Sequence, residues 1–101
     1  MAKPVFRIRS KVHLFPGHAG WHFVTVDAKH AKVIKQLFGT PRHGWNSIPV
    51  TVTLGNSIWQ TSIFFVAKTK TYLMGLKAAI RTAENIKVGQ TARFTIQIRD
   101  A

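Results

Sequence analysis

Cationic side chains are the most numerous groups in this chain that could take part in chemistry. The sequence contains 15 lysines and arginines against 3 acidic residues, which gives a formal net charge of +12 at neutral pH. Arg7, Arg9 and Lys11 alternate with apolar residues, and this period of two places them on one face of a predicted strand. The few carboxylates cannot neutralise so many cations, so the pattern favours an acidic partner whose phosphates these side chains would contact.

The predicted polyanion site extends over two strands and one helix. Arg93 and Arg99 lie on the last predicted strand, while the lysines that follow Asp27 lie on a predicted helix. We expect this surface to bind DNA or RNA without strong sequence specificity, because phosphate contacts carry no base information. A solvated basic face with no ligand is the competing interpretation. The complete predicted site is Arg7, Arg9, Lys11, Lys29, Lys32, Lys35, Arg93 and Arg99.

A second group of residues could instead line a pocket. Lys77 and Arg81 are one helical turn apart, so both can project to one side and hold one anionic group. Trp21 and Trp59 lie in predicted strands, where we expect them to pack in the core, whereas Trp45 lies in a loop and is free to line a site. The alternative function is a small-molecule or protein-binding barrel whose pocket is formed by Arg42, Trp45, Trp59, Lys77 and Arg81.

The residues that enzymes and metal sites need are scarce. The chain has no cysteine, and none of its three acidic residues lies beside a histidine pair that it could orient. A nucleophilic triad needs an oriented histidine and an acid beside the nucleophile. A zinc site needs several placed ligands and a supporting second shell, which His13, His18 and His22 lack in the sequence. We therefore expect a non-enzymatic binding module with no cofactor and no metal.

Alternating apolar residues predict the elements that position these groups. Asp27 is placed to cap the helix that follows it, and Gly55 followed by Asn56 predicts a tight hairpin turn. About six strands and two short helices around one core predict a single, mostly antiparallel β-barrel domain over the whole chain. The predicted strands are residues 5–14, 21–26, 50–54, 57–66, 72–74 and 91–99, and the predicted helices are residues 28–38 and 76–84.

Two further expectations follow from where the apolar residues lie. Period-two alternation places one set of side chains on the buried face of the sheet, which predicts the core. No apolar run approaches the length of a membrane span, and basic residues interrupt any signal peptide near the first residue. We therefore expect a cytoplasmic protein that does not contact membranes, while its oligomeric state is not indicated. The predicted core is Phe6, Ile8, Leu14, Val52, Leu54, Phe94, Ile96 and Ile98.

Several phrases of the sequence are similar to one family of small prokaryotic domains. They are Trp21-x-Phe23-Val24-x-Val26, Gly44-Trp45-x-Ser47-Ile48-Pro49-Val50, Trp59-x-Thr61-Ser62-x-Phe64 and Ile86-x-Val88-Gly89. The chain resembles, over nearly its whole length, the domain of unknown function nineteen-oh-five. The resemblance implies a double-split β-barrel related to transition-state-regulator and antitoxin DNA-binding domains. It implies no activity, so the expected function depends on the residues above.

Overall fold

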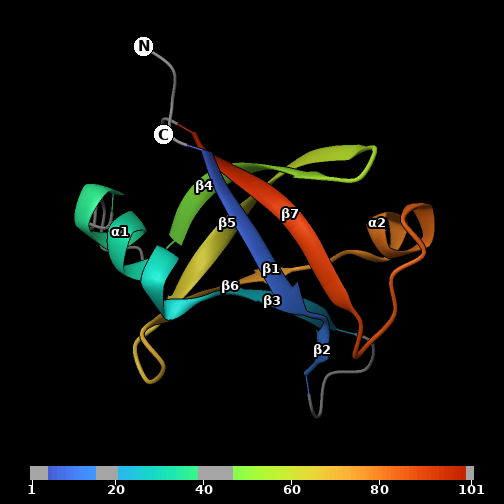
Figure 1. The fold of residues 1–101 in the computed structure, drawn as a ribbon, viewed down its shortest axis with the longest axis horizontal. Helices are drawn as coiled ribbons and strands as arrows, with labels where there is room; N and C mark the ends of the chain where they lie inside the picture. The colour runs from blue at the N-terminus through green and yellow to red at the C-terminus, as the bar shows by residue number, and fades with distance from the viewer. Residues whose placement is uncertain (1–4, 16–20, 39–46, 100–101) are drawn as a thin grey trace.

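The computed structural model of the protein describes residues 5–15, 21–38 and 47–99, which form seven strands and two helices (Figure 1). A strand is followed directly by a helix at two places in the chain: β3 leads into α1, and β6 leads into α2. In chain order the elements are β1 Val5–Lys11, β2 His13–Leu14, β3 His22–Val26, α1 Ala28–Phe38, β4 Ser47–Leu54, β5 Ser57–Val66, β6 Thr71–Gly75, α2 Ala78–Ala83 and β7 Thr91–Ile98.

The strands form one curled antiparallel sheet in the order β1-β7-β4-β5-β6-β3-β2. The curl brings β1 from one end of this order next to β3, while α1 and α2 lie on opposite sides of the molecule (Figure 1). Between β1 and β3, the Ser10 hydroxyl accepts a hydrogen bond from the Thr25 backbone N–H at 3.0 Å. The predicted mostly-β, barrel-like fold with two short helices is confirmed.

The first predicted strand is broken in two at Val12, which gives one strand more than expected. β1 pairs with β7, whereas β2 pairs with β3, so the chain changes neighbours at this point. The Val12 N–H donates to the Gln90 carbonyl and the Val12 carbonyl accepts from the Gly89 N–H, both at 2.9 Å. A local alternation pattern cannot reveal such a corner, because it does not depend on which strand lies alongside.

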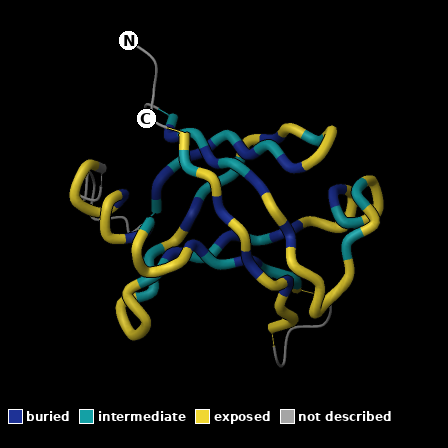
Figure 2. The backbone as a smooth tube through the Cα atoms, in the orientation of Figure 1, coloured by how far each residue is buried: buried dark blue, intermediate teal, exposed yellow. Residues whose placement is uncertain are grey.

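The predicted core is largely confirmed, with one wrong position. Ile8, Val52, Leu54, Phe94, Ile96 and Ile98 are buried, and Phe6 is half-buried against them. Leu14 is instead 48% exposed, because it lies in the two-residue strand β2 at the margin of the sheet. Figure 2 shows the alternation of buried and exposed residues along β1 and β7 that the period of two predicts.

Candidate functional site

Four of the predicted cations lie together on the outer face of the β1–β7 pair. Arg9 is directly opposite Arg93, Arg7 is opposite Thr95, and Lys11 is opposite Thr91. Their side chains alternate with the buried residues of both strands and are exposed. Directly opposed and diagonal neighbours on one face of a sheet lie within reach of long side chains. Arg7, Arg9, Lys11 and Arg93 therefore form one continuous surface, the β1–β7 cationic face.

The positive charges of this face form no salt bridge with any carboxylate among the described residues. In the part of the chain that the structure describes, no lysine or arginine lies within salt-bridge distance of an acidic side chain. The Asp27 carboxylate is bound to His30, and Glu84 accepts a hydrogen bond from the Ser57 hydroxyl at 2.6 Å. Like charges directly opposite each other destabilise a sheet, so the arrangement of Arg9 and Arg93 carries a cost in stability.

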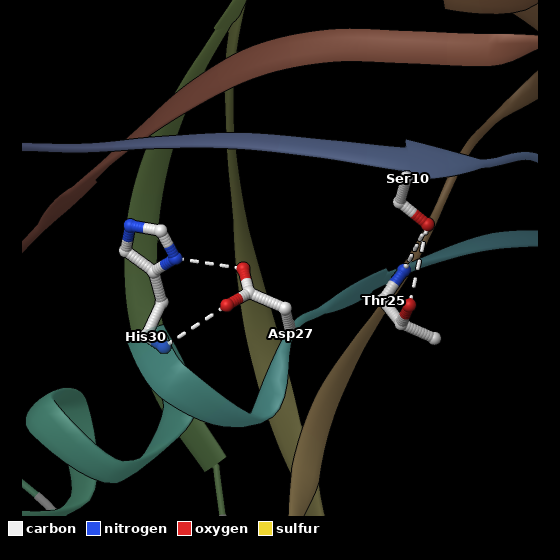
Figure 3. A network of polar contacts seen from close by, with 4 residues as sticks. All are labelled: Ser10, Thr25, Asp27 and His30. Atoms are coloured by element: carbon white, nitrogen blue, oxygen red, sulfur yellow. Dashed lines mark hydrogen bonds and ion pairs between the residues drawn. The ribbon is translucent and has the colours of Figure 1, made fainter.

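A cavity of about 760 Å³ adjoins this face, and the beginning of α1 forms part of its wall. Arg7, Arg9 and Arg93 line it from the strands, and Asp27 and His30 line it from the helix. Asp27 caps α1 as predicted, since its Oδ2 accepts the His30 backbone N–H at 3.2 Å while its Oδ1 lies 2.7 Å from His30 Nδ1 (Figure 3). Partial burial raises the pKa of Asp27, but the hydrogen bonds with His30 outweigh it and hold the pKa below its ordinary value.

The other four predicted cations are not part of the β1–β7 cationic face. Lys29 and Lys32 are exposed on α1. Lys35 lies over the ring of Phe65 in β5, with its Nζ 3.6 Å from the ring centroid, so it makes a cation–π contact within the fold. Arg99 follows β7 and is half-buried, and its backbone N–H donates to the Pro49 carbonyl at 2.9 Å.

A second cavity, of about 400 Å³, lies where β5 and β6 diverge, and we call it the β5–β6 cavity. Of the residues predicted for the alternative pocket, Trp59, Lys77 and Arg81 line it together. Arg42 and Trp45 lie outside the described residues. The structure thus brings three of the five predicted pocket residues to one place.

Sequence reasoning missed Trp21, His22 and Thr61, which also line the β5–β6 cavity. The expectation that Trp21 packs in the core is wrong, since Trp21 is 39% exposed. Trp59 is buried as expected, with an exposed fraction of 8%. Period two could have revealed this, because Val24 and Val26 point to the core and residues of odd number in this segment therefore point the other way.

The described segments contain neither a cluster of potential metal ligands nor a helix suited to cross a membrane. Within residues 5–15, 21–38 and 47–99, no three potential ligands gather closely enough to hold a metal ion. Of the three histidines considered, His13 stacks on Phe23 and His22 lies beside Arg81, while His18 falls outside the described residues. Neither α1 nor α2 has the length and apolar character of a helix that crosses a membrane.

Comparison with known proteins identifies the family to which this fold and these residues belong. No curated protein matches the chain. The family model described as the domain of unknown function DUF1905 matches residues 9–96. This match includes Arg9, Lys11 and Arg93 of the cationic face and all the residues that line the β5–β6 cavity. The chain belongs to the DUF1905 family.

Proposed function

We propose that the protein binds nucleic acid or another polyanion through the β1–β7 cationic face. The observation that carries this proposal is the direct opposition of Arg9 and Arg93, while no carboxylate of the described residues lies within salt-bridge distance of either. A phosphate that bridges the two guanidinium groups converts their repulsion into two charge-assisted hydrogen bonds. The repulsion between Arg9 and Arg93 thus costs stability in the free protein and is relieved when a phosphate binds between them.

The shape of the face favours a polymer over a single small anion. Residues on one face of a strand are separated by about 6.7 Å, so the row from Arg7 to Lys11 is about 13 Å long. Arg93 widens this row on the neighbouring strand. A row of this length matches a ligand with several phosphates, and it contacts the backbone without entering a groove to contact base edges.

The test is binding of duplex DNA, single-stranded DNA and RNA, each titrated at two salt concentrations, with the wild type and the Arg9→Gln/Arg93→Gln double variant. Each phosphate contact on duplex DNA contributes about −0.9 to the slope of log K against log salt. We expect the double variant to bind all sequences more weakly and to flatten the slope by up to about 1.8. Glutamine keeps polarity and approximate length, and removal of the repulsion leaves the variant at least as stable as the wild type.

The matched control is Lys68→Gln/Lys70→Gln, which removes the same charge from the exposed turn between β5 and β6. If only net charge matters, both double variants lose the same affinity for nucleic acid. If the β1–β7 cationic face is the binding site, only Arg9→Gln/Arg93→Gln loses affinity. Absence of binding to every nucleic acid at about 50 mM salt, where non-specific electrostatic binding is strong, contradicts the proposal. Equal weakening by the two double variants also contradicts it.

A further inference from the structure

We infer that the β5–β6 cavity is a second binding site, which accepts a small planar aromatic molecule bearing one anionic group. This site is distinct from the β1–β7 cationic face, since none of the described residues lines both cavities. The inference therefore stands or falls separately from polyanion binding.

The strand pairing creates this cavity. β5 pairs with β6 only through Phe64, Phe65 and Val66, whereas β6 continues alongside β3 as far as Gly75. The first half of β5, which carries Trp59 and Thr61, therefore diverges from the end of β6, and the cavity opens between them. Its volume of about 400 Å³ falls within the usual range of sites for small molecules, which is about 300–1,000 Å³.

Two indole rings give the cavity aromatic walls. Trp59 is almost fully buried in its strand. Trp21 is exposed but well supported. It stacks on Phe23 with ring centroids 5.3 Å apart and an interplanar angle of 26°, and it forms a T-shaped contact with Phe15 at a centroid distance of 5.4 Å. A ring held in this way can stack on a flat ligand with little loss of conformational entropy. The walls therefore select a planar molecule.

Two cations among the described lining residues, Lys77 and Arg81, determine the charge of the ligand. The Arg81 Nε donates to the Leu76 carbonyl at 3.1 Å, and Nη1 lies 3.3 Å from His22 Nε2, so the guanidinium is held in place. A guanidinium has five N–H donors, so these two contacts leave others that can bind an anion in the cavity. Lys77 adds a second positive charge, and none of the described residues that line the cavity is acidic. A carboxylate or phosphate group bound in the cavity therefore contacts both Lys77 and Arg81.

The two probes are adenosine monophosphate, with a phosphate group, and indole-3-acetate, with a carboxylate. Binding is measured by calorimetry and by the tryptophan indole N–H signals in NMR spectra. We expect saturable binding of at least one probe with a Kd below about 1 mM. If adenosine monophosphate binds, adenosine, which lacks the phosphate, should bind at least about tenfold more weakly. The probe that binds identifies the anionic group.

Lys77→Gln removes a cation whose side chain is exposed, and Lys87→Gln removes another exposed charge, outside the cavity. We expect Lys77→Gln to weaken probe binding about fivefold or more, and Lys87→Gln to leave it unchanged. The Arg9→Gln/Arg93→Gln variant retains full probe affinity, so loss of nucleic-acid binding and loss of this site are distinguishable. No saturable binding of either probe, or equal effects of Lys77→Gln and Lys87→Gln, overturns the inference.

Discussion

Tyr72 is a buried phenol whose ionisation is coupled to folding. Only 2% of the residue is exposed, and its ring packs against Phe65 at 5.3 Å in an edge-on contact. Burial raises the pKa of Tyr72 above its ordinary value of 10.0, because the phenolate is poorly solvated inside the protein. A pKa raised in the folded state means that the associated stability is fully present below pH 10.0 and is lost as the pH rises through the folded pKa.

The Tyr72→Phe variant tests this coupling. At neutral pH we expect its free energy of unfolding to lie within about 1 kcal/mol of the wild type, since the ring is kept. Above pH 10.0, the free energy of unfolding of the wild type falls by up to about 1.4 kcal/mol per pH unit more than that of the variant. This difference accumulates between the pKa of Tyr72 in the unfolded chain and its raised pKa in the folded protein. Tyr72 is the only tyrosine, so phenolate absorbance reports its titration directly. An ordinary pKa by absorbance, or parallel alkaline stability profiles, contradicts this prediction.

At the scale of the elements, one polar contact connects the β4–β5 hairpin to α2. The Ser57 hydroxyl, just after the turn, donates to the carboxylate of Glu84, which follows α2. Gly55 in the turn has a φ of +58°, and a Cβ added there would overlap the Glu84 side chain. The positive φ therefore favours glycine at this position, and a Cβ there would displace the flexible end of the Glu84 side chain.

Ser57→Ala removes this connection and should lower the free energy of unfolding by about 1–2 kcal/mol, because a hydrogen bond to a charged group is lost. Gly55→Ala should cost more, since alanine disfavours a φ of +58° and its Cβ displaces the Glu84 carboxylate that Ser57 contacts. The control is Gln60→Ala, an exposed position in the same strand, which should change stability by less than about 0.5 kcal/mol. Denaturant unfolding measures all three variants. A Ser57→Ala variant as stable as Gln60→Ala would show that the connection does not contribute to stability.

At the scale of the whole molecule, a side chain contributes to the contact between β1 and β3. The Ser10 hydroxyl accepts the Thr25 N–H at 3.0 Å and lies 3.2 Å from the Thr25 hydroxyl (Figure 3). It also donates to the Lys11 carbonyl at 2.8 Å. Ser10→Ala leaves that N–H without its acceptor and should cost about 1–3 kcal/mol. Thr25→Val keeps the N–H bond and should cost less than Ser10→Ala. Amide hydrogen exchange at residue 25 should accelerate in Ser10→Ala, and unchanged exchange there would contradict this role.

The core depends on contacts among strands that are distant in the sequence. Phe94 is 4% exposed and lies opposite Ile8 in the β1–β7 pair. Phe94→Ala should lower the free energy of unfolding by about 3–5 kcal/mol, because it leaves a cavity among these side chains. Phe94→Leu keeps most of the volume and should cost about 1.5 kcal/mol or less. A loss below about 1 kcal/mol for Phe94→Ala in denaturant unfolding would remove this residue from the core and contradict the strand register.

Local rules were enough to predict much of the fold and part of each candidate site. Period-two alternation identified Ile8, Phe94 and Ile96 as core residues, because successive side chains of any strand point to opposite faces. The cap at Asp27 and the turn at Gly55 depend only on nearby backbone groups and were also predictable. The same alternation placed Arg7, Arg9 and Lys11 on one face of a single strand.

Only the tertiary structure decided which of these groups meet. The pairing of β1 with β7 places Arg9 opposite Arg93, and the divergence of β5 from β6 brings Trp21, Trp59 and Arg81 around one cavity. His22 and Arg81 are 59 residues apart in the chain and 3.3 Å apart in the fold. Strand order, register and curvature arise from packing of the whole core, which no window of the sequence contains. The sequence by itself therefore determined which faces are apolar or cationic, and the folded sheet determined which of them form a site.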